Sequence, residues 1–354
     1  MARIDALLDE VLRRRGSDLH FIAGDPPRIR LHGDLAPLRA DALTAEDAKA
    51  TLIEIMPRKA MERFDAKDGA DFAYTLEGKG RFRVNVMRHL NGMGGVFRAI
   101  PSQALTLDEL NMPLAVRQLA QANNGLILVT GKTGSGKSTS LAAMIDDINK
   151  RIKGHILTIE DPIECVHTRR NCLISQREIG VHAPSFAAAL HSALREDPDV
   201  VLVGELRDLE TMSIAVTAAE MGILVMGTLH TNGAAPTVDR MVNAFPSDKQ
   251  SHVRTMLSTS LRGVVSQQLL KRKDGAGRVA ALEILINTPA AANLIRQGKL
   301  DQLESTMQSG GQFGMRTMDS AIQQLLDGGL ISGAEAYKKG MNKAHFEPVK
   351  DQLH

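Results

Sequence analysis

The sequence predicts an α/β protein in which a parallel sheet, covered by helices on both faces, follows a smaller α+β domain. Strand-like apolar runs alternate with helical periodicity through the middle of the chain, which is typical of such a sheet. A glycine-rich segment separates the first of these runs from the helix after it. A chain of 354 residues is longer than a domain with one hydrophobic core usually is, so more than one domain is expected. The content of 43% apolar and 24% charged residues excludes disorder of the whole chain.

Residues 1–100 are predicted to form the α+β domain, which carries no catalytic motif of its own. Apolar residues recur with helical spacing between residues 4 and 12, which predicts an amphipathic first helix. A second helical pattern covers residues 44–64. Strand patterns fall at residues 19–22, 28–31, 71–75, 81–87 and 95–100.

Residues 101–113 lose both patterns and are predicted to be a linker to the sheet domain, residues 114–290. Buried strands are expected at residues 126–130, 156–159, 200–203 and 223–228, with helices at 137–152, 185–195 and 208–221. Two further strands, at 264–270 and 278–286, are expected to form a hairpin. Residues 291–354 are predicted to be short helices separated by glycine.

Charge and composition narrow the classes of partner. With 43 basic and 41 acidic residues and only nine Phe and two Tyr, the chain lacks the basic surface and stacking platforms of nucleic-acid binders, so no nucleic-acid partner is expected. Cys165 and Cys172 are too few for a four-sulfur metal site and are expected to be reduced thiols. Neither a signal core nor an apolar run of about 20 residues is present, so we expect an intracellular protein that meets membranes through a partner.

The strongest motif is a phosphate loop that follows the strand at 126–130 and precedes a helix. Its residues are Gly131, Lys132, Thr133, Gly134, Ser135, Gly136, Lys137 and Ser138, followed by Thr139. Glycines let backbone N–H groups turn toward an anion, and the helix N-terminus adds its positive dipole end. Lys137 would reach the β- and γ-phosphates of ATP, and Ser138 would hold Mg²⁺. A glycine-rich structural turn is the competing interpretation.

Polar residues follow three other predicted strands. An acidic cluster, residues 160–164, comes after one strand, Glu205 closes a second, and His230 ends a third. Ligands of open parallel sheets bind at the carboxyl ends of the strands, so we expect these side chains to share an edge with the phosphate loop. The competing interpretations are surface loop charges and a structural histidine.

These motifs, and several longer strings, closely resemble the secretion ATPase superfamily (GspE/PilT family), and within it the PilT-like type IV pilus retraction ATPases. The resemblance covers essentially the whole chain. In the N-terminal part it rests on Gly16-Ser17-Asp18-Leu19-His20, Pro26-Pro27-Arg28-Ile29-Arg30 and Arg81-Phe82-Arg83-Val84-Asn85. In the sheet domain it rests on an acidic box at residues 157–164, a Walker B segment led by residues 192–199, and a histidine box at residues 227–231.

The resemblance implies a PAS-like N-terminal domain, a RecA-like P-loop ATPase domain and C-terminal helices. It implies that Glu164 polarises the attacking water and that Glu205 is the Walker B glutamate near Mg²⁺. Gly204 stands where other P-loop proteins carry the Walker B aspartate. His230 would sense the γ-phosphate.

The same resemblance implies roles for several arginines. Arg83 and Arg98 would close over the nucleotide and couple domain motion to catalysis. Arg207, together with Arg195 and Arg240, is a candidate for charge neutralisation or subunit contacts. The sequence does not rank these last three.

The resemblance further implies a cytoplasmic homohexamer at the inner-membrane face of the pilus machine, where it would act on a platform protein. No four-cysteine insertion lies in the hairpin, which favours the retraction branch. One departure, the altered signature at residues 290–297, points to an accessory PilU-like paralogue that works with a principal motor. Lys132 stands at a position where the family commonly has proline, but that position is free in the phosphate-loop pattern, so we expect nucleotide binding to survive this change. A nucleotide-gated scaffold of low turnover and a DNA-translocating relative are two further hypotheses.

Overall fold

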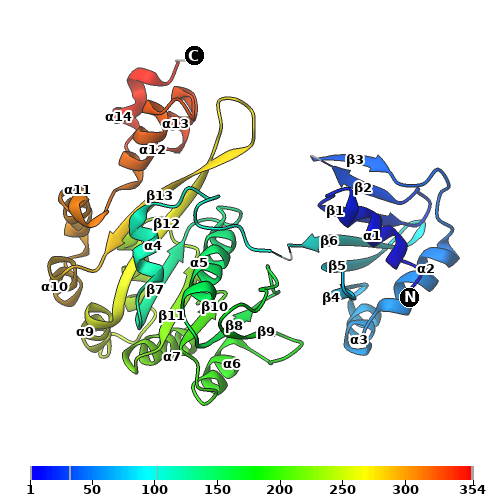
Figure 1. Cartoon of the computed structure of the whole chain (residues 1–354), viewed down its shortest axis with the longest axis horizontal. Coiled ribbons are helices and arrows are strands. Elements are labelled where there is room, and N and C mark those ends of the chain that lie inside the picture. The colour runs from blue at the N-terminus through cyan, green and yellow to red at the C-terminus, as the bar shows by residue number, and fades with distance from the viewer. Residues whose placement is uncertain (1, 32, 102, 352–354) are drawn as a thin grey trace. The chain divides into compact units, whose positions relative to one another are not determined.

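In the computed structural model, which describes residues 2–31, 33–101 and 103–351, the chain forms two compact units (Figure 1). The first comprises Met1–Gln103 together with the short segment Glu164–Thr168. The second comprises Ala104–Ile163 and Arg169–His354. Residues 1, 32, 102 and 352–354 of the ranges expected from the sequence lie outside the described residues.

The first unit is built on a six-stranded antiparallel sheet in the order β3-β2-β1-β6-β5-β4. The strands are β1 Asp18–Ile22, β2 Arg28–Leu31, β3 Asp34–Pro37, β4 Gly69–Leu76, β5 Gly80–His89 and β6 Gly92–Ile100, and the helices are α1 Asp5–Arg13, α2 Ala45–Ile55 and α3 Arg58–Lys67. All three helices share one core with alternate strand residues such as Phe82 and Phe97. On β5 the intervening residues, Arg83 and Asn85, are exposed, so helices and strands bury only one face of this strand.

The structure differs from the sequence prediction at two places in this unit. The single helical pattern over 44–64 is two helices, because Pro57 offers no N–H to a continuing helix and Met56 before it is extended. Strand β3 was not predicted. It is a short, mostly exposed strand at the sheet edge, where no alternation of apolar residues is required.

The second unit contains a seven-stranded sheet in the order β13-β12-β7-β11-β10-β8-β9. All neighbours are parallel except β12 and β13, which form the predicted antiparallel hairpin. The strands are β7 Gly125–Thr130, β8 His155–Glu160, β9 Leu173–Glu178, β10 Val200–Val203, β11 Leu224–Leu229, β12 Leu261–Lys271 and β13 Arg278–Ile286. The predicted fold class is confirmed.

Helices cover both faces of this sheet, as the nearly continuous apolar strands require. The helices are α4 Leu114–Ala120, α5 Lys137–Arg151, α6 Phe186–Ala193, α7 Leu209–Glu220, α8 Ala234–Asn243 and α9 Gln250–Ser260. Leu126 and Leu128 of β7 share a core with α6 to α9, whereas Ile127 and Val129 share the opposite core with α4 and α5.

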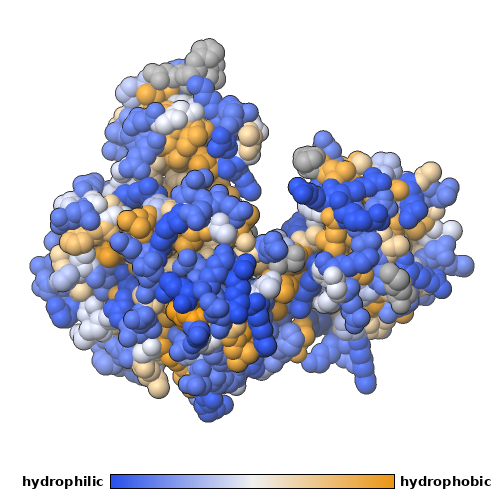
Figure 2. Space-filling model, viewed as in Figure 1, coloured by the Kyte–Doolittle hydropathy of each residue, from blue (hydrophilic) through white to orange (hydrophobic). Residues whose placement is uncertain are grey.

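The chain ends in short helices: α10 Pro289–Gln297, α11 Leu303–Ser309, α12 Met318–Asp327, α13 Gly333–Lys339 and α14 Lys343–Phe346. The last three share a small core with the hairpin, which includes Leu270 and Phe346. None of the helices in the described part of the chain has the length and apolar character needed to cross a bilayer. Hydrophilic side chains cover most of the face seen in Figure 2.

Candidate nucleotide site

The phosphate loop joins β7 to α5, and its glycines are fixed by backbone geometry and by one neighbouring residue. Gly131 and Gly136 have φ angles of 138° and 90°, which favour glycine. A Cβ on Gly131 would lie 2.3 Å from the carbonyl oxygen of Gln267, and one on Gly136 would lie 2.6 Å from its side-chain Nε2. The loop therefore holds this shape only with glycine at both positions.

Lys137 begins α5, and its ammonium group lies inside the loop. The Nζ atom donates hydrogen bonds to the carbonyl oxygens of Gly131 at 2.8 Å and Lys132 at 3.1 Å. Burial lowers the pKa of Lys137, and the negative charge of Glu205 partly opposes that shift. The ammonium group is thus partly desolvated inside the loop, and a bound anion would compensate for the lost hydration.

Two hydroxyl groups of the loop region suit a phosphate and its cation. The buried Oγ of Ser135 has no hydrogen-bond partner in the described part of the chain, and such orphaned groups in a phosphate loop are natural donors to phosphate oxygens. The Ser138 side chain, in the first turn of α5, is exposed. Among the described residues no group of three or more His, Cys, Asp or Glu could hold a metal. Mg²⁺ bound through one hydroxyl, one carboxylate, phosphate and water needs no such group.

The predicted gathering of Glu205 and His230 is observed. Strands β10 and β11 are parallel neighbours, so the residues that follow them lie at one edge. The Glu205 carboxylate contacts Nε2 of His230 at 3.4 Å and the Arg207 guanidinium at 2.8 Å. Glu205 is partly buried, whereas His230 and Arg207 are exposed, so an acid, a base and a permanent cation meet at the surface of this edge.

Gly204, the residue before Glu205, has a steric reason to be glycine. A Cβ there would lie 3.2 Å from the carbonyl oxygen of Ile159 and 3.3 Å from the Cα of Glu160. The Glu160 side chain is itself buried and accepts a hydrogen bond from Thr158 at 2.7 Å. An aspartate at position 204 would crowd strand β8, which leaves Glu205 as the acid at the end of β10.

Other predicted residues belong to the N-terminal unit. Glu164 lies with that unit and is exposed. Arg83 and Arg98 face each other across β5 and β6, and Arg98 donates a 2.9 Å hydrogen bond to Asp18. Burial by itself would raise the pKa of Asp18, but hydrogen bonds from Ser17 and Arg98 outweigh it and the pKa is lowered.

The remaining predicted residues lie on the surface of the second unit. Thr133 and Thr139 are exposed. Arg195 contacts the ring of His191 at 3.1 Å, and Arg240 is exposed near the end of α8. Neither arginine is brought to Glu205 by a contact of the kind that Arg207 makes.

Sequence reasoning missed Gln267 and Glu283, both buried in the hairpin strands. The side chain of Gln267 accepts a 2.7 Å hydrogen bond from Ser140 of α5, beneath the phosphate loop. Glu283 accepts hydrogen bonds from the backbone of two helices. A polar residue in the interior of an otherwise apolar strand pattern is the signal that could have found them.

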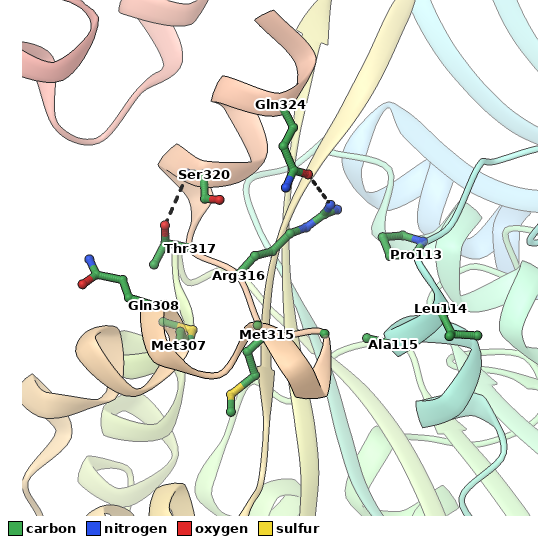
Figure 3. A pocket seen from close by; sticks show the side chains of 12 residues that line it. Pro113, Leu114, Ala115, Met307, Gln308, Met315, Arg316, Thr317, Ser320 and Gln324 are labelled. Atoms are coloured by element: carbon green, nitrogen blue, oxygen red, sulfur yellow. Dashed lines mark hydrogen bonds between the residues drawn. The ribbon is translucent and has the colours of Figure 1, made fainter. Parts of the chain in front are cut away.

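A cavity of about 460 Å³ lies elsewhere in the second unit (Figure 3). It is formed by the start of α4, the α11 helix and the segment that leads into α12. Its lining includes Leu114, Met315 and Arg316 and no residue of the phosphate loop. The nucleotide site is therefore defined by the loop and the strand ends and not by this cavity.

The parallel sheet, the phosphate loop at its edge and the preceding α+β unit define a P-loop ATPase with a RecA-like domain. Comparison with known proteins supports this assignment to the P-loop ATPases. A family model described as "Type II/IV secretion system protein" matches residues 1–327. The "Type IV pilus retractation ATPase PilT" of Pseudomonas aeruginosa strain PAO1 is 48% identical over 97% of this chain and 99% of its own.

Two further comparisons are informative. The "Type IV pilus ATPase PilU" of the same organism is 41% identical over 98% of this chain and 89% of its own. A solved structure described as "Crystal Structure of the Pilus Retraction Motor PilT and Bound ADP" matches with a TM-score of 0.90 and 42% identity, over 98% of this chain and all of that one. The chain belongs to the family of type II/IV secretion system proteins, on its PilT-like branch.

Proposed function

We propose that this chain is the ATP-hydrolysing motor of type IV pilus retraction, which takes pili apart and drives twitching motility. The observation that carries the proposal is the meeting of Glu205, His230 and Arg207 at the sheet edge that also bears the phosphate loop. The full-length likeness to a pilus retraction ATPase supports the same function. A protein that only bound nucleotide would have no need of this acid, base and cation beside the loop.

The loop residues would bind the phosphates of ATP. Backbone N–H groups of residues 131–136, the Ser135 hydroxyl and the Lys137 ammonium would donate to phosphate oxygens, so Lys137 would exchange its two carbonyl partners for phosphate. Ser138 and Glu205 would hold Mg²⁺. When bound, that ion would supply neutralisation of phosphate charge.

The other site residues would act on the attacking water and on the charge that develops at the γ-phosphate. Glu164 would polarise the water, and His230, which contacts Glu205, would respond to the γ-phosphate. Arg207, Arg83 and Arg98 would neutralise transition-state charge. Arg98 would first have to leave Asp18, its partner in this structure, so closure over the nucleotide would exchange one ion pair for another.

The assembly belongs to the proposal. We expect a homohexameric ring on the cytoplasmic side of the inner membrane, where it would turn a platform protein at the pilus base. The exposed, arginine-bearing face of β5 supports an arrangement in which one copy supplies charge to another. An accessory motor would assemble in the same way, so assembly does not separate the two roles.

The accessory, PilU-like role is the second candidate because of the altered segment at residues 290–297. That segment still forms helix α10, in which Ala291 and Ile295 are buried and Gln297 is exposed. The substitutions that distinguish this segment from the family signature therefore change the surface of α10 and one core contact, at Ala291, but leave the helix in place. The higher identity to PilT than to PilU supports the principal motor. Deletion of the gene in its source organism, with and without any paralogue, separates the two: only loss of a principal motor abolishes retraction by itself.

The biochemical test is the Glu205→Gln variant, which keeps the size of the side chain and removes its charge. We expect ATP turnover to fall by roughly 10²–10³-fold while ADP affinity stays within about threefold, since the carboxylate acts on the reaction and the loop holds the phosphates. The measurements are steady-state phosphate release and calorimetric titration with ADP. Glu210→Gln, an exposed carboxylate in the first turn of α7, is the matched control. Turnover of Glu205→Gln within about threefold of wild type would reject the catalytic assignment.

A further inference from the structure

Glu283 is a buried carboxylate for which the proposed reaction has no use. It lies in the interior of β13 with only 9% of its surface exposed. Its cross-strand neighbour on β12 is Ser266. A carboxylate in such a place is costly unless hydrogen-bond donors surround it, so its partners indicate what it does.

The first partner is the N-terminus of α8. The Oε1 atom of Glu283 accepts a 2.6 Å hydrogen bond from the N–H of Ala234, and the Oγ of Ser266 accepts one of 2.9 Å from the N–H of Gly233. The N-cap residue of α8 is Gly233, with a φ of 104°, and because glycine has no side chain the helix has no side-chain cap of its own. A pair of residues on the hairpin therefore caps this helix from outside.

The second partner is the N-terminus of α12. The Oε2 atom of Glu283 accepts a 3.1 Å hydrogen bond from the N–H of Met318. Thr317, the local cap, accepts from Ser320 instead, as Figure 3 shows. The backbones of Arg316 and Ile284 also exchange hydrogen bonds of 2.9 and 3.1 Å. Helix α12 is thus attached to β13 beside Glu283.

The charge of Glu283 fits this double role. Two helix N-termini, each the positive end of a helix dipole, converge on one carboxylate. Burial raises the pKa of Glu283, and the hydrogen bonds from Ala234 and Met318 oppose that shift. Both carboxylate oxygens are engaged, so no neutral side chain of the same size can accept from both helices.

The segment that Glu283 holds leads directly to the nucleotide site. Gly233 lies three residues after His230, on the loop between β11 and α8. Thr231 of this loop contacts Thr237 of α8 at 2.7 Å, and Thr237 donates to the carbonyl oxygen of Gly233 at 2.6 Å. His230 is therefore fixed at one end by strand β11 and at the other by the capped start of α8.

We propose that Glu283 is a positioning residue for ATP hydrolysis: it holds the loop that carries His230 and joins that loop to helix α12. The inference rests on the proposed role of His230. It adds a physical link from the C-terminal helices to the reaction, because helix α12 and the loop that carries His230 are bonded to the same carboxylate. A shift of either one would therefore displace Glu283.

The test uses the full-length Glu283→Gln variant. The amide nitrogen of glutamine cannot accept a hydrogen bond, so one of the two helix amides loses its partner. We expect kcat to fall about tenfold or more, since small displacements of reacting groups have effects of this size. KM and the ADP dissociation constant should stay within about twofold, because the phosphate loop is untouched.

A double-mutant cycle with His230→Ala separates positioning from a general loss of stability. If Glu283 acts through His230, Glu283→Gln lowers kcat in the wild-type background and has no further effect, within about twofold, in the His230→Ala background. The matched control is Asp327→Asn at the other end of α12. The exposed Asp327 carboxylate accepts a hydrogen bond from the side chain of Gln323, within the helix, so kcat should be retained.

Three results would overturn the inference: an unchanged kcat in Glu283→Gln, effects on kcat that multiply in the double-mutant cycle, or an equal loss of kcat in Asp327→Asn. If Glu283→Gln does not fold, as judged by circular dichroism, Ser266→Ala takes its place. A loss of kcat of about threefold or more that depends on His230 would then support the inference, and an unchanged kcat would reject it.

Full activity of His230→Ala would reject the role of His230 and this inference together. A loss in His230→Ala without one in Glu283→Gln would reject the inference alone.

Discussion

At the scale of the residue, Lys137 shows how the site is prepared for an anion. Its ammonium group is buried and satisfied only by two backbone carbonyl oxygens among the described residues. Burial disfavours its charged form, and Glu205 compensates in part. A bound phosphate would replace neutral acceptors with charged ones, which are stronger partners for an ammonium group.

This arrangement predicts that nucleotide binding takes up a proton at alkaline pH. In the free protein the pKa of Lys137 lies below its ordinary value of 10.5, and phosphate should raise it again. Between the two pKa values the bound state holds more protons, so ADP affinity should fall as pH rises, by at most about tenfold per pH unit. Calorimetry in buffers of different ionisation enthalpy measures the uptake.

Lys137→Met provides the comparison, because methionine has no proton to take up. We expect its weak ADP binding to lose this part of the pH dependence. Equal proton uptake by the wild type and by Lys137→Met would assign the effect to another group.

At the scale of the element, the loop between β7 and α5 depends on a strand far away in the sequence. Gln267 of β12 lies against Gly131 and Gly136 and also bonds Ser140 of α5. The loop is thus shaped by its own glycines and supported from beneath by a neighbouring strand. Its conformation is a property of the sheet as well as of the motif.

Alanine substitutions in the loop should therefore differ according to the space around each glycine. Gly131→Ala combines a strained φ with a Cβ 2.3 Å from the Gln267 carbonyl, and should lower the free energy of unfolding by about 2–5 kcal/mol. Gly134→Ala has a φ of 76° but nothing within 4 Å, and should cost about 1–2 kcal/mol. Urea unfolding of the nucleotide-free proteins measures both. Equal losses would show that packing against Gln267 contributes nothing.

At the scale of the whole molecule, the chain places its phosphate loop and several of its arginines in different compact units. The loop, Glu205 and His230 belong to the second unit, whereas Arg83 and Arg98 belong to the first. Arg98 is held by Asp18 in this structure. In the proposed ring, the arginines of a first unit would supply charge to a nucleotide bound by a second unit.

We expect multi-angle light scattering to give about six times the mass of one chain at micromolar concentration with a non-hydrolysable ATP analogue. The physical reason is that a head-to-tail contact would join the first unit of one chain to the second unit of the next chain. Such a contact generates a ring when its repeated rotation brings the last chain back to the first. A mass of one or two chains, both with and without the analogue, would contradict the proposed hexamer.

Much of the site could be predicted because its parts are local. The phosphate loop is recognisable from one strand, one helix and the glycines between them. The meeting of Glu205 and His230 followed from their positions after two parallel strands. The partners of Gln267 and Glu283 could not be predicted, because Ser140 and Ala234 are 127 and 49 residues away in the sequence.

The sequence by itself determined the fold class, the phosphate loop and most of the helices and strands, since each depends on the periodicity and backbone preferences of neighbouring residues. Only the tertiary structure decided the strand order, the support of the loop by Gln267 and the joining of α8 and α12 by Glu283. The reason is that a buried polar side chain must be satisfied by whichever donors the fold brings to it, and sequence distance does not limit that choice.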